Sequence, residues 1–476
     1  MKQPQRLSRH ARFRLAYIGA DALALVVAYF LTNYIRYYFE GADLDWGNLQ
    51  AYLFGSRAQA VGGAVLILWF LIITLSGYYN RPLHRGRYDD FVASLKNSFI
   101  GGTIQYLLVV TNDPIEEVGR LLPIYFILLG IYFGSLFISR SIVSHIKVKW
   151  LATPKHYPNV LILGTPREKA KLLSFAEELH IQPISKIEIP SNKCTTKEEE
   201  KAQLKEILAQ CETVISLHSP SAIYLAVDKE KSTLGMRLLY ALFPYKCEIF
   251  VTAESFALTL GDLYFGSILS IPLVSIADTK MLEWEKNVKW LFDKVVSTIL
   301  LLLLSPLYFI LAILVKRSSK GPIIYKQERI GRHGKPFFIY KFRTMYTDSE
   351  QSGPALSQED DPRITPLGRV LRKYRLDELP QFWNVLKGDM SLVGPRPERA
   401  YYINQLLEDA PYYYLLHNVS PGITSLGMVY YGYASNLEEM KERLKIDWVY
   451  YRNMSLALDV KILFTTFTTL VKGKGK

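Results

Sequence analysis

Residues 290–315 read WLFDKVVSTILLLLLSPLYFILAILV, a run of apolar side chains long enough to cross a lipid bilayer. A straight helix of about 25 residues, rising about 1.5 Å per residue, would exceed a hydrocarbon core of about 30 Å. Ser305-Pro306 interrupts the run. Because proline removes a backbone donor and clashes with the preceding turn, we predict a sharp kink at this point.

Basic residues flank both ends of this run and argue against a simple crossing. Lysine and arginine beside an apolar segment favour the cytoplasmic face of the membrane. They are Lys286, Lys289 and Lys294 at the first end and Lys316, Arg317 and Lys320 at the second. The sequence therefore predicts a re-entrant helix over residues 287–317, which returns to the face from which it entered. A fifth span with a proline kink is the alternative.

The part of the chain before residue 150 is predicted to be a transmembrane bundle. Apolar segments at 16–35, 61–75, 99–110 and 121–138 give four spans, of which the third is the shortest. By the positive-inside rule, the charges in the connections place both ends of the bundle in the cytoplasm. The basic residues are Lys2, Arg6, Arg9, Arg12, Arg14, Arg81, Arg85 and Arg87, and the acidic residues on the opposite side are Glu40, Asp43, Asp45, Asp113, Glu116 and Glu117.

Asp21 lies inside the first of these apolar segments. A carboxylate in hydrocarbon is costly, so its presence raises the question of a functional role. We favour the simpler interpretation that Asp21 lies near the interface or is bonded to a neighbouring helix.

The composition narrows the class of protein. The 476-residue chain has a mean hydropathy of +0.08 and 13% aromatic residues, which are high values for a purely soluble protein. Its net charge of +13 gathers beside the apolar segments and in one C-terminal block, without a basic recognition helix, so anionic lipid and phosphate-bearing substrates are favoured over nucleic acid. Three scattered cysteines, Cys194, Cys211 and Cys247, indicate neither a disulfide framework nor a CxxC metal site.

The middle of the chain alternates β-rich runs with helical patterns, which predicts an α/β layered domain. The turn after the first run reads Leu163-Gly164-Thr165-Pro166-Arg167, and it lacks the further glycines that a dinucleotide pyrophosphate needs. A structural or regulatory domain is therefore favoured over a cofactor site. The predicted strands are 160–163, 213–217, 222–227 and 248–251, and the predicted helices are 167–179 and 198–208.

Two adjacent carboxylates, Asp377 and Glu378, follow a basic stretch that holds Arg369, Arg372, Lys373 and Arg375. This pattern suits phosphoryl transfer, because one acid can attack phosphorus, the other can help to hold a divalent cation, and guanidinium groups offset phosphate charge. Neighbouring residues of a helix point about 100° apart, so the two acids should play different roles. The structural alternative is that Asp377 caps a helix that ends at Gly388.

A loop rich in glycine and proline follows, from Gly388 to Pro397, and encloses Arg396. A rigidly held arginine suits a phosphate or a carboxylate. The loop could equally serve only to turn the chain.

From about Lys286 onward, the chain resembles the bacterial sugar transferase family, the monotopic phosphoglycosyl transferases that begin lipid-linked glycan assembly. The resemblance rests on long, ordered motifs: the Ser-Pro helix break, KFRTM at 341–345, LDELPQ at 376–381, NVLKGDMS at 384–391 and VGPRP at 393–397. The preceding spans and α/β segment are similar to the enlarged members of this family.

The resemblance implies a mixed membrane protein in three parts. They are a four-helix transmembrane bundle at 1–150, a central Rossmann-like (CoA-binding-like) α/β domain at 151–280, and an α/β catalytic domain at 281–476 that includes the re-entrant membrane helix. The implied location is the bacterial inner membrane, with the catalytic domain in the cytoplasm. Enlarged members are expected to pair through their added domains, so a homodimer is one arrangement that the resemblance allows.

The chemistry implied by the resemblance is a two-step transfer in exopolysaccharide or lipopolysaccharide biosynthesis. Asp377 would attack the sugar-linked phosphorus of a UDP-sugar, release UMP and form an aspartyl phosphosugar, which undecaprenyl phosphate then attacks. Glu378 would support Mg²⁺. Lys341, Arg343 and Arg372 would bind phosphate groups, and Arg396 would help to hold the nucleotide diphosphate.

The sequence departs from the commoner family pattern at two places. Arg375 stands where many members have serine, and Ser425-Leu426-Gly427-Met428 stands where hexose-specific members often read Gly-Leu-Trp-Gln, so the transferred sugar is left open. The apolar stretch at 456–471 could lie on an anionic membrane surface or pack against the catalytic domain. Two alternative functions also stay open: a non-catalytic scaffold in polysaccharide assembly, and a membrane-bound nucleotide-sugar dehydrogenase or dehydratase.

Overall fold

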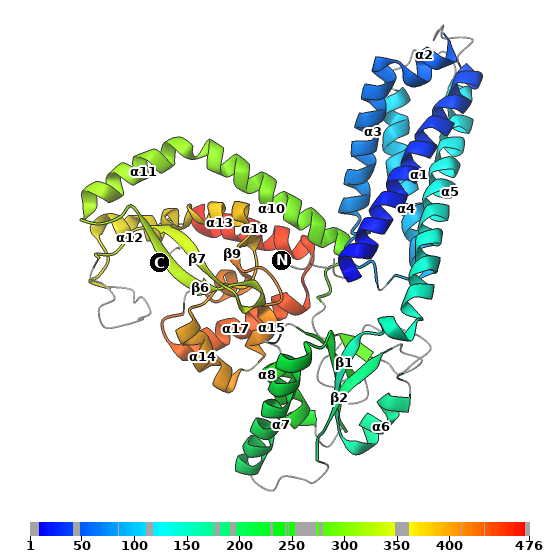
Figure 1. The fold of residues 1–476 in the computed structure, drawn as a ribbon. Coiled ribbons are helices and arrows are strands. Elements are labelled where there is room, and N and C mark those ends of the chain that lie inside the picture. The colour runs from blue at the N-terminus through cyan, green and yellow to red at the C-terminus, as the bar shows by residue number, and fades with distance from the viewer. Residues whose placement is uncertain are drawn as a thin grey trace, which may run out of the picture. The chain divides into compact units, whose positions relative to one another are not determined.

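The computed structural model forms two compact units, which are Met1–His156 with Glu283–Val288, and Tyr157–Leu282 with Lys289–Lys476 (Figure 1). It describes residues 9–40, 48–83, 85–110, 118–174, 176, 181–190, 197–228, 232–242, 245, 247–252, 273–275, 279–347, 361–410, 412–432 and 434–471. The acidic connections at 41–47 and 111–117, together with Lys2, Arg6, Cys194 and the last lysines, lie outside the described residues.

The first unit is a helical bundle. Among the described residues of this unit, three helical segments are long and apolar enough to cross a membrane: Arg9–Phe39, Ser56–Leu75 and Leu122–Leu151. The predicted segment at 99–110 is the second half of a longer helix whose first turn carries Asp89 and Asp90. The helices are α1 (Arg9–Glu40), α2 (Leu49–Phe54), α3 (Ser56–Leu75), α4 (Arg87–Val110) and α5 (Val118–Leu151).

A buried ion pair joins two helices of this bundle. Asp21 of α1 receives two hydrogen bonds from Arg140 of α5, at 2.9 Å and 2.8 Å, and a third from the Tyr79 hydroxyl at 2.8 Å. Arg140 also donates to Ser94 of α4 at 3.1 Å. Both charged side chains are fully buried. The interpretation that Asp21 is bonded to a neighbouring helix is therefore confirmed.

We predict that Asp21→Asn destabilises the bundle by about 3 kcal/mol, because it leaves the Arg140 guanidinium buried without its counter-charge. Thermal unfolding of the detergent-solubilised chain measures the effect. The double variant Asp21→Asn/Arg140→Met should recover part of the lost stability, since no unpaired charge stays buried. A single variant as stable as the wild type would contradict the prediction.

The second unit begins with a five-stranded sheet in the order β2-β1-β3-β4-β5. Its first four strands are parallel and β5 runs antiparallel to β4. This parallel α/β sheet confirms the predicted layered domain. The strands are β1 (Asn159–Gly164), β2 (Gln182–Glu188), β3 (Ala222–Ala226), β4 (Glu248–Thr252) and β5 (Leu273–Ser275), and the helices are α6 (Pro166–Ser174), α7 (Lys197–His218) and α8 (Ser232–Leu242).

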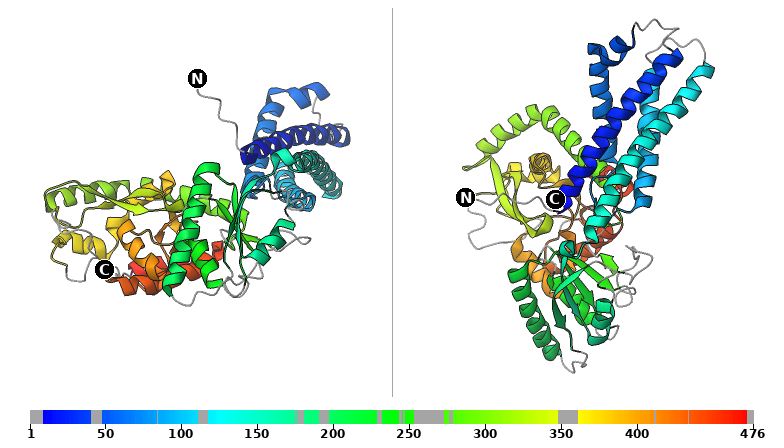
Figure 2. Two further views of the ribbon diagram at one scale, coloured as in Figure 1. Left: turned by 60° about the horizontal axis from the view of Figure 1, so that its bottom comes forward. Right: turned by 45° about the vertical axis from the view of Figure 1, so that its right-hand side comes forward.

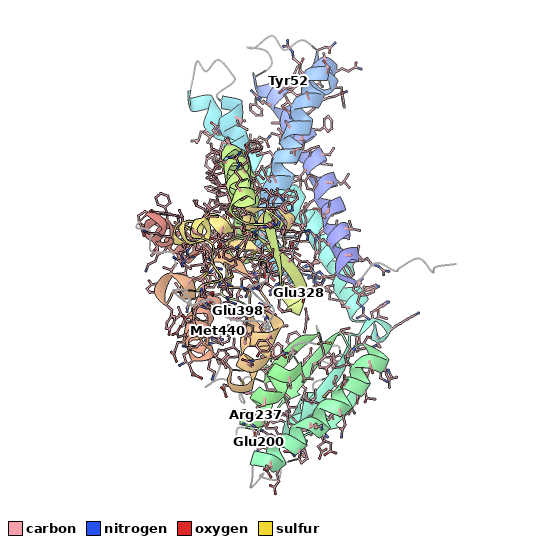
Figure 3. All side chains as sticks on the ribbon, turned by 90° about the vertical axis from the view of Figure 1, so that its left-hand side faces the viewer. Tyr52, Glu200, Arg237, Glu328, Glu398 and Met440 are labelled. Carbon is pink, nitrogen blue, oxygen red and sulfur yellow. The ribbon has the colours of Figure 1, made fainter. Side chains whose placement is uncertain are left out.

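The strand predicted at 213–217 is wrong, because these residues form the end of α7. Their β-branched side chains continue a helical stripe, since Ile207 and Cys211 are buried in the core and Val214 packs against it. Strand β2 was not predicted, because Pro183 and scattered polar residues obscure its alternation. An ion pair of 3.4 Å between Arg237 of α8 and Glu200 of α7, both labelled in Figure 3, joins the two helices.

The predicted kink at Ser305-Pro306 is confirmed. The chain bends by 63° between helices α10 (Glu283–Leu303) and α11 (Ser305–Ser318), and the two arms of the bend are visible in Figure 2. The Ser305 hydroxyl donates to the Leu302 carbonyl at 2.8 Å, which helps to close the end of the first helix. Around the bend, large apolar side chains such as Leu302 and Phe309 are about 70% exposed (71% and 70%).

Helix α10 has a polar side that holds the rest of the second unit. Lys289 donates to the Val393 carbonyl at 2.8 Å, and Asp293 accepts from the Ser391 hydroxyl at 2.6 Å. Lys294 donates to the Val385 carbonyl at 2.7 Å. One side of this helix therefore exposes large apolar side chains, whereas charged side chains on the other side bond to backbone carbonyls and to the Ser391 hydroxyl.

The remaining elements complete the second unit, and among them α12 and β7 contact the short segment that carries the two adjacent acids. Strands β6 (Ile324–Ile330) and β7 (Pro336–Phe342) form an antiparallel hairpin, and β8 (Ser391–Val393) pairs in parallel with β9 (Gly422–Thr424). The other elements are α12 (Pro366–Lys373), η5 (Leu376–Glu378), α13 (Gln381–Lys387), α14 (Ala400–Asp409), α15 (Tyr413–Leu416), α16 (Leu426–Tyr430), α17 (Leu437–Arg452) and α18 (Leu456–Val471).

Candidate active site

The two adjacent acids lie in a single 3₁₀ turn, η5, between α12 and α13. Arg375 precedes this turn with a left-handed backbone, φ 53° and ψ 26°. Such a conformation costs a residue other than glycine about 1–2 kcal/mol, and it is often found at functional sites. The turn buries both Asp377 and Glu378. Two carboxylates are thus held side by side away from water.

Asp377 is not a helix cap, so the structural alternative for this residue is wrong. Helix α13 begins at Gln381, and its N-cap is Pro380, which has no capping side chain. The other end of the alternative is confirmed, because Gly388 closes the helix in the left-handed conformation with φ 101°.

Glu378 is the centre of a buried ion cluster. Its Oε1 atom accepts from the Lys341 ammonium on β7 at 2.7 Å and from the Arg396 guanidinium at 3.3 Å. A second nitrogen of Arg396 contacts the Met428 sulfur at 2.9 Å. The structure therefore brings together three of the predicted site residues from separate segments.

The environment pushes the pKa values of the two acids in opposite directions. The pKa of Asp377 is raised to about 6, chiefly by burial and also by the charge of Glu378, while the charges of Lys341 and Arg372 act in the opposite direction. Burial also opposes ionisation of Glu378, but Lys341 and Arg396 outweigh it and hold the pKa of that carboxyl well below its usual range. At neutral pH both groups are carboxylates, and Asp377 is the more basic of the two.

The structure places Arg372 and Arg343 differently. Arg372 of α12 donates to the Thr344 hydroxyl at 3.0 Å, and its charge acts on Asp377. Arg343 is buried against the end of α11, where it donates to the carbonyls of Val315, Ser319 and Pro322. The structure therefore does not bring Arg343 to the cluster around Glu378. These contacts indicate that Arg343 bonds the free carbonyls at the end of α11, and they do not support a role in binding phosphate.

Arg396 is carried by a loop that the backbone fixes closely. The Gly394 amide donates to the Thr424 carbonyl and the Gly422 amide to the Pro395 carbonyl, both at 3.0 Å. A Cβ atom at either glycine would collide with backbone of the other segment. Glycine is thus required at both positions because two segments of the chain approach closely there. This close approach sets the direction in which the Arg396 side chain leaves the loop.

Several residues of the site were missed by sequence reasoning. Thr344 and Met428 contact the predicted arginines, while Asp447 of α17 accepts from the Gly427 amide at 2.8 Å. Thr344 lies within a quoted motif, so its position was a usable signal. Asp447 lies in an ordinary helical pattern, and nothing in the local sequence indicates its contact.

A magnesium ion can be tested against the side chains present. Within the described ranges, no group of three or more His, Cys, Asp or Glu side chains is close enough to hold a metal. Mg²⁺ is commonly held by one or two carboxylates together with substrate phosphates and water. Glu378 offers one carboxylate, whose Oε1 atom is already bonded to Lys341 and Arg396. The residues present therefore fit a Mg²⁺ ion that is also bound by substrate phosphates.

The C-terminal part of the chain, which holds this site, is similar to known proteins. Residues 284–473 match the model of the bacterial sugar transferase family. The chain is 44% identical over 216 residues to a UDP-N-acetylgalactosamine-undecaprenyl-phosphate N-acetylgalactosaminephosphotransferase of Aeromonas hydrophila, covering 45% of this chain and 48% of the relative. It is 38% identical over 185 residues to a UDP-glucose:undecaprenyl-phosphate glucose-1-phosphate transferase of Caulobacter vibrioides, covering 38% of this chain and 69% of the relative.

A third relative is a UDP-glucose:undecaprenyl-phosphate glucose-1-phosphate transferase of Escherichia coli (strain K12), 35% identical over 246 residues, or 51% of this chain and 53% of the relative. These matches define the class of the protein as a bacterial sugar transferase, and its long apolar helices indicate association with a membrane. The chain belongs to the bacterial sugar transferase family. The matched segments span about half the length of the first relatives, 48% and 53%.

We predict that Asp377→Asn does not lower the thermal stability of the chain at pH 8. Because the pKa of Asp377 is raised on folding, ionisation of this group opposes the folded state, and the stability it contributes is lost as the pH rises through about 6. The melting temperature of the variant relative to wild type should therefore be higher at pH 8 than at pH 5. A variant that is relatively less stable at pH 8 would contradict the assignment.

Proposed function

We propose that the protein transfers a sugar 1-phosphate from a UDP-sugar to undecaprenyl phosphate at the cytoplasmic face of the bacterial inner membrane. The observation that carries the proposal is the buried Asp377–Glu378 pair, with Lys341 and Arg396 bonded to Glu378 and the charge of Arg372 acting on Asp377. The names of two relatives mention a UDP-sugar and undecaprenyl phosphate, which supports these compounds as the donor and the acceptor.

In the first step, an oxygen of the Asp377 carboxylate attacks the phosphorus that bears the sugar. A bond forms between this oxygen and phosphorus, and the bond from phosphorus to the oxygen of UMP breaks, so that UMP leaves with the bonding electrons. Asp377 suits this role because its pKa is the higher of the two acids, which makes its carboxylate the better nucleophile. Its pKa still lies low enough for ionisation at neutral pH.

In the second step, a phosphate oxygen of undecaprenyl phosphate attacks the same phosphorus. The new oxygen–phosphorus bond forms as the bond to Asp377 breaks, which restores the carboxylate and yields the lipid diphosphate sugar. Lys341, Arg372 and Arg396 offset the negative charge that collects on the phosphates in both steps. Splitting the transfer in two lets a soluble donor and a lipid acceptor use one nucleophile in turn.

Glu378 would hold a Mg²⁺ ion that is shared with the donor diphosphate. When bound, the ion would neutralise phosphate charge. The salt bridges to Lys341 and Arg396 keep Glu378 ionised, so its carboxylate would be ready for the metal at any pH near neutrality.

The membrane arrangement of the proposal has three parts. The N-terminal bundle at 1–150 would span the bilayer four times, with α4 as the third of the four spans. The central Rossmann-like domain at 151–280 would stay in the cytoplasm. The bent pair α10–α11 would enter the membrane and return as a re-entrant helix, supported by its 63° bend and by basic residues at both ends.

The reaction is tested by release of UMP from UDP-sugars by detergent-purified protein with Mg²⁺ and undecaprenyl phosphate. A panel led by UDP-N-acetylgalactosamine and UDP-glucose covers the donors that the relatives are named for. Wild type should release UMP with at least one donor, and Asp377→Asn should lose more than about 10³-fold of the rate, because it lacks the nucleophile.

The matched control for this assay is Glu442→Gln, which removes an acid from an exposed ion pair with Lys445. It should keep the wild-type rate. Folded wild-type protein that is silent across a wide panel, or an active Asp377→Asn variant, would refute the proposed function.

The re-entrant path is tested by single cysteines in a chain whose native cysteines are replaced by serine. Lys280→Cys and Lys320→Cys flank the bent pair, and Gln50→Cys lies in the first connection. In intact cells, a membrane-impermeant maleimide should label only Gln50→Cys, since both ends of the bend are expected in the cytoplasm. Labelling at Lys320→Cys but not at Lys280→Cys would show a true crossing instead.

A further inference from the structure

A second buried ion cluster lies directly behind the loop that carries Arg396. Its centre is Glu398, labelled in Figure 3, which follows the Arg396-Pro397 step. One carboxylate oxygen of Glu398 accepts from Arg329 of β6 at 2.8 Å, and the other accepts from Arg443 of α17. Glu398 and Arg443 are each 6% exposed. One acid thus binds two arginines from two different elements.

Arg329 also bonds to the backbone of the loop that carries Arg396. Arg329 donates to the Pro397 carbonyl at 3.1 Å, and the Ile330 amide donates to the Glu398 carbonyl at 3.0 Å. The segment from Pro397 to Glu398 is therefore fixed to the end of β6 by one side-chain bond and one backbone bond, in addition to the ion pair. On its other side, Arg396 is already tied through the crossing of Gly394 and Gly422.

Helix α17 brings a further support to this loop. Asp447, one turn beyond Arg443, is buried and accepts a hydrogen bond from the Gly427 amide at 2.8 Å. The backbone amide of Arg396 is a second donor to the same carboxylate. Arg396 is therefore held from behind by α17 and β6, while its guanidinium reaches forward to Glu378. Among the described residues, Glu398 and Arg443 bond to each other and not to Asp377 or Glu378, and the link from Glu398 to the acid pair runs along the loop to Arg396.

We propose that Glu398 is a positioning residue for the transfer, which sets the guanidinium of Arg396 against Glu378 and the donor diphosphate by joining Arg329 to Arg443. This inference rests on the proposed function for its substrate and deepens it by naming what orients the arginine. A bidentate acid between two guanidinium groups suits this task, because each bond fixes direction as well as distance. Glutamine keeps the shape but cannot balance two buried cations.

The test is a double-mutant cycle of Glu398→Gln with Arg396→Met in the full-length, detergent-purified chain. Two quantities are measured: kcat/KM for the best UDP-sugar donor, and the Kd for UDP alone. In the wild-type background, Glu398→Gln should lower kcat/KM and weaken UDP binding by about tenfold. In the Arg396→Met background it should change either quantity by less than about twofold, since the group it positions is gone.

A purely structural role predicts a different result, because loss of stability acts in both backgrounds alike. Equal factors for Glu398→Gln with and without Arg396 would therefore overturn the inference. Arg443→Lys serves if Glu398→Gln does not fold, since it keeps the charge but loses the fork that orients Glu398, and the same cycle applies. Glu442→Gln, the neighbouring exposed acid of α17, should leave both quantities unchanged.

The cycle also separates this inference from the proposed function. If wild type binds UDP but transfers no sugar from any donor, the proposed function fails, and coupling in the UDP affinity still decides the positioning role. If wild type transfers sugar but shows no coupling, only the positioning role is overturned. If the chain neither transfers sugar nor binds UDP, both are refuted.

Discussion

The burial of two adjacent carboxylates is the constraint on which the arrangement of β7, α12 and the loop after β8 depends. Removing a carboxylate from water costs several kcal/mol, and the attraction of a nearby cation is needed to offset this cost. Lys341 and Arg396 meet this need for Glu378, and Lys341 and Arg372 act by charge on Asp377. These cations come from β7, from α12 and from the loop after β8, so the hairpin, helix and loop must all be in place before the pair is stable.

Helix α10 explains how an exposed apolar surface and this site can be built together. Its polar side chains bond to two backbone carbonyls and one hydroxyl of β8 and α13. In sequence, α13 follows the two acids and β8 precedes Arg396. Its other side leaves large apolar side chains exposed. Helix α11 then returns over the site, where the Tyr308 hydroxyl donates to the Leu379 carbonyl at 2.7 Å, directly after the acid pair. A bent helix is thus both the apolar surface and a wall of the active region.

Local sequence was enough to predict the features that depend on local chemistry. Proline fixed the kink, and the order of motifs indicated the acid pair and the arginine loop. Features that depend on distant partners were not readable. Lys341 and Glu378 meet across 37 residues of chain. Arg343 is two residues beyond Lys341, but strand β7 ends at Phe342, so the alternation stops and Arg343 turns to the end of α11.

The error at 213–217 has a similar origin. Threonine, valine and isoleucine favour strands when considered alone, but here they continue the buried stripe of α7, and tertiary packing overrides intrinsic propensity. The supports behind Arg396, formed by Glu398, Arg443 and Asp447, were invisible for the opposite reason. Acids and arginines usually mark solvated faces, and only their burial in the fold shows that they hold the loop.

The central claim is that Asp377 becomes covalently bonded to the sugar phosphate. Its most direct test is intact mass measurement of the purified chain, quenched in acid after brief incubation with an active UDP-sugar and Mg²⁺ but without undecaprenyl phosphate. We expect a mass increase equal to one sugar 1-phosphate less one water, assigned by peptide mapping to Asp377, that disappears when undecaprenyl phosphate is added. UMP release without any adduct, or an adduct on another residue, would contradict the account.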